Sequence, residues 1–281
     1  MRFPAPLPLA ILAAAAAGLG CSANVVAAPE PDAESGPTSA AFVEITRTSA
    51  GDGSRTVARF ARVRGGTLGD GEMDLLRVGL ALPPVDSCAV ANPARSGREG
   101  PSPRAVELAD VGALSVEAGG ATSILTARQL PDVIDLVSGV VYWGEAPLPS
   151  RGRYELRATG RAELDAPPFV IAAQSPGEPQ DVRVAGQSGA QITLPAGSVD
   201  LSWEPGSTDD LVYVDIAARG QPTTRCAFAD GGRAAIPSSA IAQAEEGTLA
   251  IHRVHREGFR VRGVDRGEVR FDLARVVGFK R

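Results

Sequence analysis

The chain contains very little lysine, histidine or aromatic side chain. Lys280 is the only lysine, and the 281 residues include two histidines and 5% aromatic residues. A phosphate-binding loop of the Walker type needs a lysine within a glycine-rich turn, and a lysine at the penultimate position cannot supply one. Two histidines leave few candidate bases for a serine or cysteine triad. The low aromatic content counts against surfaces built by stacking, such as sugar-binding or single-strand-binding sites.

The chain also lacks an excess of positive charge. Its formal net charge is −5, so we expect no nucleic acid partner. Hydrophobic residues make up 44% of the chain and charged residues 22%. These proportions are ordinary for a globular protein that buries a sizeable core.

The apolar run near the N-terminus, Leu7 to Ala17, follows Arg2. It is too short to span a bilayer, which takes about 20 apolar residues, but it has the length of the apolar region of a secretory signal. Gly18 and Gly20 flank a leucine, and Cys21 follows. This AGLGC stretch resembles the lipobox of bacterial lipoprotein precursors, although the family usually has leucine three residues before the cysteine, where this chain has Gly18.

The resemblance implies a signal peptide over residues 1–20 and a lipid-modified Cys21 that becomes the mature N-terminus. Residues 21–40 are rich in Ala, Pro, Ser and acidic residues without an apolar period, which predicts a flexible tether. Ser22 is not the aspartate that retains many such proteins in the inner membrane, so the resemblance favours the outer membrane or cell surface. Two alternatives remain open: an ordinary secretory signal cut after Ala23, and a cytoplasmic protein with an apolar start.

From residue 41 onward, short runs with alternating apolar and polar residues are bounded by Gly and Pro. This pattern predicts an all-β fold with two tandem β-sandwich domains, at 41–165 and 166–281. The runs predicted as strands include 41–48, 56–65 and 73–83. The stretch 236–247 is the exception, because Pro237 and two serines can start a short helix that Gly247 ends.

The segment SVDLSWEPGSTDDLVYVDIAA, residues 198–218, resembles the central strand pair of a fibronectin type III or immunoglobulin-like sandwich. The resemblance implies that Trp203 is buried between two sheets, with Tyr213 and Val214 on the next strand.

Cys88 and Cys226 are the cysteines that remain when Cys21 is assigned to lipid, and they lie 226 − 88 = 138 positions apart. In an exported chain they can form a disulfide between the two predicted domains. They can equally be two buried thiols that behave as small hydrophobic residues. DSCAVANP looks like a loop and TRCAFADGG like a strand, so the sequence leaves the pairing open.

The motifs that carry catalysis or metal binding give no candidate site. His252 and His255 lie in an alternating strand, where positions three apart point to opposite faces, so we expect two surface histidines and no metal site. Asp209–Asp210 and Asp230 are expected in solvated turns. We expect no catalytic residues and no cofactor.

These observations predict a lipid-anchored, non-catalytic envelope protein that serves as a structural or protein-interaction module. Its expected partners are the membrane, through the lipid anchor, and an unidentified envelope protein or glycan. A ligand-binding or glycan-binding lipoprotein is the first alternative and needs a cleft that exposes Trp143. A hydrolase with a pair of carboxylates is the second.

Overall fold

The computed structural model describes residues 38–49, 51, 53–63, 67–69, 76, 80–91, 106–133, 137–162, 166–242 and 244–281. Residues Gly36–Arg281 form one compact unit, which holds all the strands named below. Among the described residues, no helix has both the length and the apolar character needed to cross a membrane.

The described chain is almost entirely β-structure, which confirms the predicted all-β class. Side chains alternate between buried and exposed along these strands, as in β9, where the residues at 169, 171 and 173 are buried. The strands of the first half are β1 (Ser39–Thr48), β2 (Ser54–Arg62), β3 (Ser87–Val90), β4 (Val106–Leu108), β5 (Leu114–Ala118), β6 (Ala121–Val133), β7 (Val137–Ala146), β8 (Arg151–Ala158) and β9 (Phe169–Pro176).

The second half adds eight strands and the predicted short helix. The helix α2 (Ser238–Ile241) begins directly after Pro237, as expected, but it ends at Ile241 and not at Gly247, which lies in a strand. The strands are β10 (Arg183–Val184), β11 (Gln191–Thr193), β12 (Val199–Ser202), β13 (Leu211–Ala218), β14 (Thr224–Ala229), β15 (Arg233–Ile236), β16 (Glu246–Val261) and β17 (Val264–Lys280).

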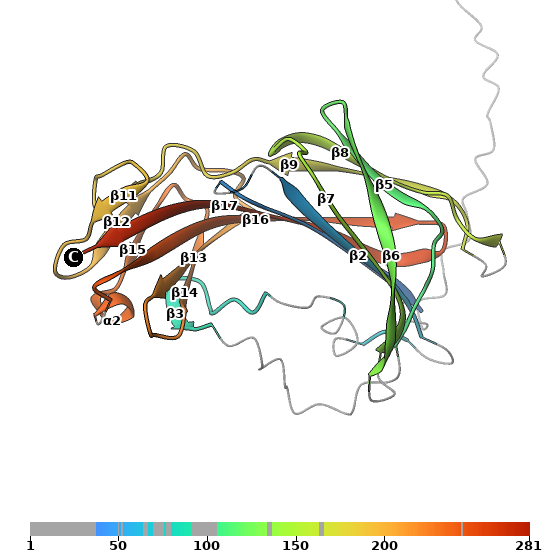
Figure 1. Ribbon diagram of the computed structural model, residues 1–281, viewed down its shortest axis with the longest axis horizontal. Helices are drawn as coiled ribbons and strands as arrows, with labels where there is room; N and C mark the ends of the chain where they lie inside the picture. Colours follow the sequence, from blue (N-terminus) through green and yellow to red (C-terminus); the bar gives the residue numbers. More distant parts are fainter. Residues whose placement is uncertain are drawn as a thin grey trace, which may run out of the picture. The chain divides into compact units, whose positions relative to one another are not determined.

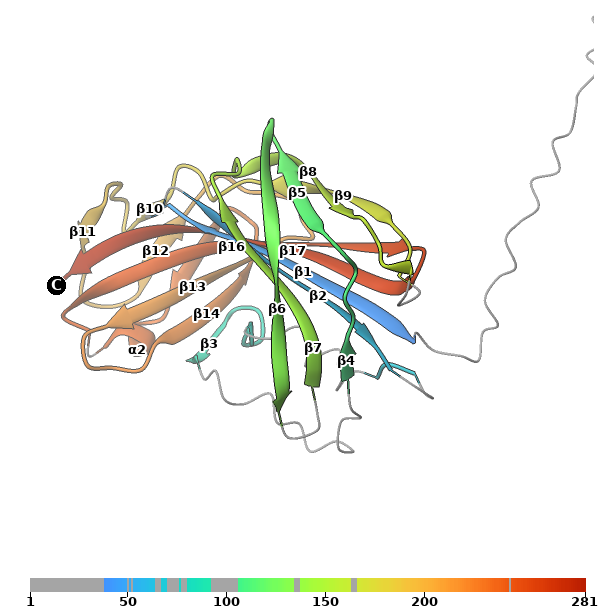
Figure 2. The same cartoon turned by 45° about the vertical axis from the view of Figure 1, so that its right-hand side comes forward.

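One large sheet connects the two halves of the chain. Its order is β14-β13-β16-β17-β1-β2-β4-β7-β6-β5-β8-β9, and β11 pairs with β17. The central connection is β1, which runs parallel to β17 and antiparallel to β2. Figures 1 and 2 both show β16 and β17 as long neighbouring strands that extend from β13 and β14 to the strands of the first half of the chain.

The two largest of four hydrophobic clusters among the described residues lie along this sheet and are called the first and second cores. The first is enclosed by β1, β2 and β5 to β9, and the sheet curls until β9 lies beside β16, where the Gln174 N–H donates to Glu257 Oε2 at 2.9 Å. The second lies between the small sheet β10-β12-β15 and the strands β13, β14, β16 and β17. Trp203 is buried in this second core, as expected, with 4% of its surface exposed.

The domain boundary expected at residues 165–166 falls within the β8–β9 hairpin, whose strands pair along their whole length. Residues 259–273 of β16 and β17 contribute to the first core, although they come last in the chain. The two cores therefore share strands. Alternation along one strand cannot reveal such sharing, because the register between distant strands is set only by packing.

Three further local expectations are wrong. No strand is formed by the described residues of 73–83, since Leu76 is helical and 80–83 are irregular. Residues 87–90, expected in a loop, form β3. Strand β1 also begins at Ser39, inside the range predicted as tether.

Candidate functional site

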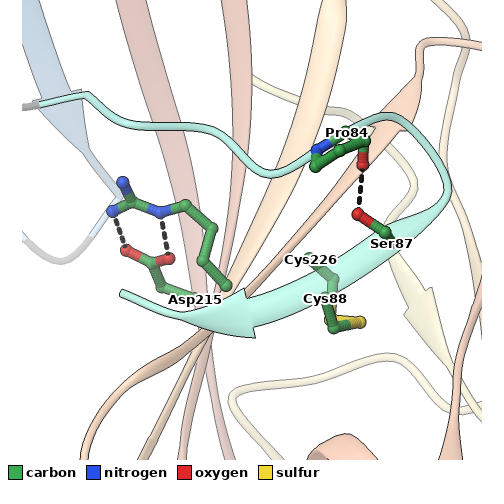
Figure 3. Close-up of a disulfide and its surroundings, with 6 residues drawn as sticks. Pro84, Ser87, Cys88, Asp215 and Cys226 are labelled. Atoms are coloured by element: carbon green, nitrogen blue, oxygen red, sulfur yellow. Dashed lines mark hydrogen bonds and ion pairs between the residues drawn. A yellow bond between two sulfur atoms is a disulfide. The ribbon is translucent and has the colours of Figure 1, made fainter. Parts of the chain in front are cut away.

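A disulfide joins Cys88 on β3 to Cys226 on β14, with their Cα atoms 4.0 Å apart (Figure 3). Cys226 is fully buried in the second core, and Cys88 packs against the same core. The bond therefore ties a segment from the first half of the chain to a strand of the second half.

The segment around β3 lies along β14, which is the last strand at its end of the large sheet. The N–H of Asp86 donates to the carbonyl of Ala227 at 2.7 Å, and the N–H of Ala91 donates to that of Thr223 at 2.7 Å. Arg225 donates to the carbonyl of Ala81 at 3.1 Å. An uncovered edge strand is a site of unwanted pairing, so this segment protects the β14 edge.

A polar network occupies the outer face of β13, β16 and β17, which is the face opposite the second core. The rings of Tyr213 and His252 are stacked with centroids 4.1 Å apart. The Tyr213 hydroxyl donates to Asp272 Oδ2 at 2.8 Å, and His252 Nδ1 lies 2.7 Å from Asp272 Oδ1. Burial, followed by the charge of Asp272, raises the pKa of Tyr213. The tyrosine therefore stays protonated and donates to the carboxylate.

The network continues towards the β14 edge and is covered from outside. The Arg225 guanidinium lies over the Tyr213 ring at 4.6 Å and forms two hydrogen bonds of 2.7 Å with Asp215. Leu80 and Leu82 pack on the apolar cluster that contains Tyr213. The disulfide-bound segment thus shields this network from water, which strengthens its charge-assisted hydrogen bonds.

The carboxyl group of Asp272 makes the outer-face network sensitive to acid. Burial raises its pKa, but the hydrogen bond and charge of His252 and the hydrogen bond of Tyr213 outweigh burial, so the pKa is lower than that of a free Asp. A group whose pKa is depressed by folding stabilises the protein above its unfolded pKa, about 3.9, and loses this contribution as pH falls through the folded pKa. We therefore expect the free energy of unfolding to fall below about pH 4.

The measurement is urea unfolding at a series of pH values for the unchanged protein and for Asp272→Asn. The variant should be less stable at neutral pH and should show a flatter decline in acid. An acid slope identical in both proteins would contradict a role for this carboxyl group.

A second network lies on the inner face, between the two cores. Arg253 Nε donates to Asp230 Oδ2 at 2.6 Å, and the Trp203 Nε1–H donates to the other oxygen of that carboxylate. Arg253 also donates to the carbonyl of Glu204. The side chains of Arg253 and Asp230 are 2% and 0% exposed, so this is a fully buried ion pair.

The second histidine pairs with a further buried carboxylate in the same region. His255 Nδ1 lies 2.6 Å from Asp210 Oδ1, and the Asp210 side chain is 0% exposed. A Cβ at Gly206 would meet Asp230 Oδ2 at 2.5 Å and Asp210 Oδ2 at 2.9 Å. Glycine is therefore required at position 206 because the two carboxylates are packed against its backbone.

These contacts correct the expectation of surface histidines and of solvated positions for Asp210 and Asp230, whereas Asp209 is exposed in a turn, as expected. His252 and His255 do point to opposite faces of β16, as the alternation predicted, but each is held by a carboxylate. Asp210 is 1% exposed and Asp230 5%. One signal in the sequence was missed. Arg253 points to the same face of the strand as Leu249 and Ile251, and a charged side chain at a core position requires a partner.

A pair of carboxylates, which the hydrolase alternative needs, is present in Asp210 and Asp230. Both are covered by the backbone at Gly206 and are bonded to His255 and Arg253. A carboxylate that acts on a substrate must reach it, so this pair has the geometry of a structural site. Among the described residues, no group of three or more His, Cys, Asp or Glu is placed to hold a metal ion.

The glycan-binding alternative needs Trp143 in a cleft. Trp143 is half-buried on β7, and the Arg128 guanidinium covers its ring at 4.7 Å. A cleft of about 570 Å³ lies elsewhere, beside Asp110, Tyr142 and Arg161. Asp110 accepts hydrogen bonds from both of these side chains, so its carboxylate is occupied within the fold.

Cys21, the predicted lipidation site, lies outside the described residues, as do the signal peptide and nearly all of the tether. No known protein-family model matches the chain, and no curated protein matches its sequence.

Proposed function

We propose that this is an exported, lipid-anchored envelope protein whose β-fold serves as a non-catalytic interaction module. The observation that carries the proposal is the Cys88–Cys226 disulfide. Disulfides form and persist in oxidising compartments such as the periplasm and the cell surface, and they are rare in the cytosol. Together with the apolar run that ends at Cys21, the bond supports export and disfavours the cytoplasmic alternative.

The polar side chains support the non-catalytic part of the proposal. On both faces of β16 the histidines are half-buried and are bonded to carboxylates that are buried. Such networks stabilise and specify a fold. The fold presents its loops for contacts, and loops on a rigid β scaffold are common binding surfaces. We propose an envelope protein or a glycan as the partner.

The anchor is tested by substituting Cys21 with Ala in cells that produce the full chain. The unchanged protein should partition with membranes, and its intact mass should match residues 21–281 plus a glyceryl-linked acyl set. Cys21→Ala should abolish acylation, because the thiol sulfur is the attachment atom. The mature, acylated protein should therefore be missing from the membrane fraction. Ser22→Ala is the matched control and should remain acylated.

A chain that begins near Asn24 without lipid would contradict the anchor and support simple secretion. A cytosolic chain with Met1 intact would contradict export as well.

A further inference from the structure

The end of the β16–β17 hairpin carries a cluster of exposed arginines. Arg260, Arg262 and Arg266 are all exposed, and among the described residues none of the three forms an ion pair with an acidic side chain. They lie within seven positions of one another on two paired strands and their turn. We refer to these three residues as the hairpin arginines.

Two of the hairpin arginines, Arg260 and Arg266, border a groove of about 390 Å³. Its lining includes Arg256, Arg260 and Arg266, and Gly258 lies between the first two on the same face of β16. A Cβ at Gly258 would meet no atom closer than the Gly267 carbonyl oxygen at 3.9 Å. The missing side chain leaves room for a phosphate group beside the guanidinium groups of Arg256 and Arg260, in a groove that Glu268, opposite Gly258 on β17, also lines.

Acidic residues near the cluster are already engaged. Asp265 accepts from the N–H and hydroxyl of Thr38 at 2.9 and 3.0 Å, and from the N–H of Ser39 at 3.0 Å. Glu268 Oε1 lies 3.9 Å from Arg256 Nε. Although the whole chain has a net charge of −5, the hairpin end thus presents positive charge to solvent.

The same hydrogen bonds fix where the chain enters the fold. Thr38 is the first described residue, and it is bonded to the hairpin end. Seventeen peptide units separate it from Cys21 (38 − 21 = 17). At a maximum of about 3.6 Å per residue this spans at most about 60 Å. The hairpin end is therefore the part of the fold closest along the chain to the proposed anchor.

We propose that the hairpin end docks on an anionic lipid surface, with lipid phosphate groups bound by the hairpin arginines. This inference rests on the proposed lipid anchor, which places the membrane at this end. Each basic side chain close to an anionic membrane strengthens binding by about fivefold. Three such contacts orient a protein that is already anchored, and they bind weakly without the anchor.

The experiment uses residues 36–281, because this compact unit contains every described strand and both cores. It lacks Cys21, so its binding is measured without acylation. Co-sedimentation is measured with phosphatidylcholine vesicles, with and without phosphatidylglycerol. We expect binding that requires phosphatidylglycerol and weakens as salt is raised.

The test variant reverses the charge of the hairpin arginines: Arg260→Glu, Arg262→Glu and Arg266→Glu. Its matched control reverses three exposed arginines on strands that border the second core: Arg183→Glu, Arg233→Glu and Arg275→Glu. Both carry the same change in net charge. We expect the test variant to lose at least tenfold in partitioning and the control to keep most of its binding.

Gly258→Glu is a single-residue variant that tests the groove itself. The position tolerates a side chain because its φ lies outside the left-handed region and its Cβ direction is open. The added carboxylate should weaken vesicle binding several-fold. Because it faces Glu268 across the strand pair, the thermal unfolding midpoint should fall slightly, and binding is therefore measured well below that midpoint.

Three results with residues 36–281 would overturn the proposal, and a fourth comes from a longer chain. The first three are binding that is equal with and without phosphatidylglycerol, equal losses in the test and control variants, and no loss in Gly258→Glu. A longer version, residues 21–281 with Cys21→Ser, adds the acidic residues Glu30, Asp32 and Glu34 and is measured in the same assay. Loss of binding in this longer chain would also overturn the proposal, because the carboxylates would then neutralise the cluster. The lipid anchor is judged separately, by the mass of the protein from membranes.

Discussion

Arg253→Met is expected to lower the free energy of unfolding by about 3–5 kcal/mol. Methionine fills much of the volume of the arginine stem but lacks the guanidinium group. The hydrogen bond of 2.6 Å from Arg253 Nε to Asp230 Oδ2 is therefore lost. The Asp230 side chain is 0% exposed. The substitution therefore leaves a buried carboxylate without its counter-charge, and it also removes the donor to the carbonyl of Glu204.

Urea unfolding followed by tryptophan fluorescence measures this loss, since Trp203 donates to the same carboxylate. The double variant Arg253→Met with Asp230→Asn should recover part of the stability, because no buried charge is left unpaired. Arg219→Met is the matched control: its side chain is 87% exposed, although it lies 2.9 Å from Glu246. An exposed pair contributes about 0–1 kcal/mol. A cost for Arg253→Met as small as that of Arg219→Met would refute the assigned role of the buried pair.

The position of this pair explains why one sheet carries two cores. Along the inner face of β16, Leu249 and Ile251 belong to the second core and Phe259 packs on the first. Arg253 and His255 lie between them, bonded to Asp230 and Asp210. Buried charged groups require fixed partners. This polar zone therefore separates the two cores and fixes the positions of the loops that carry Asp210 and Asp230.

The sequence predicted the parts of this fold that depend on local pattern. Alternation predicted β1, β2 and β14, and it predicted that the two histidines lie in a strand and point to opposite faces. Pro237 predicted the start of α2. These features depend on side chains that are neighbours in the chain, so a single sequence contains them.

The features that sequence pattern missed depend on partners far away in the chain. The parallel pairing of β1 with β17 joins residues more than 220 positions apart, and nothing in either strand specifies the other. Likewise, Asp210 and Asp230 have the turn chemistry of solvated loops, and they become buried only because Arg253 and His255 lie opposite. Cys88 lies in a stretch with loop composition that becomes β3 only beside β14.

Cys88→Ala is expected to lower the free energy of unfolding by about 2–5 kcal/mol. The disulfide closes a loop of 138 residues in the unfolded chain, and losing it restores the entropy of that loop. Substituting Cys88 is preferable to substituting Cys226, because Cys226 is fully buried in the second core and its loss would add a cavity. Urea unfolding of the variant, and of the unchanged protein with and without reductant, measures the effect.

The same variant should release the segment that covers β14. The N–H groups of Asp86 and Ala91 donate to carbonyls of β14, so their hydrogen exchange should accelerate far more than exchange in β17. Reduction of the unchanged protein should reproduce both effects, since the sulfur–sulfur bond is the only covalent change. If stability falls while exchange at these amides stays slow, the segment is held by its own hydrogen bonds and the packing of Leu80 and Leu82, and the disulfide acts through the unfolded chain alone. If both change together, the bond also holds the cover over the Tyr213 network in the folded protein.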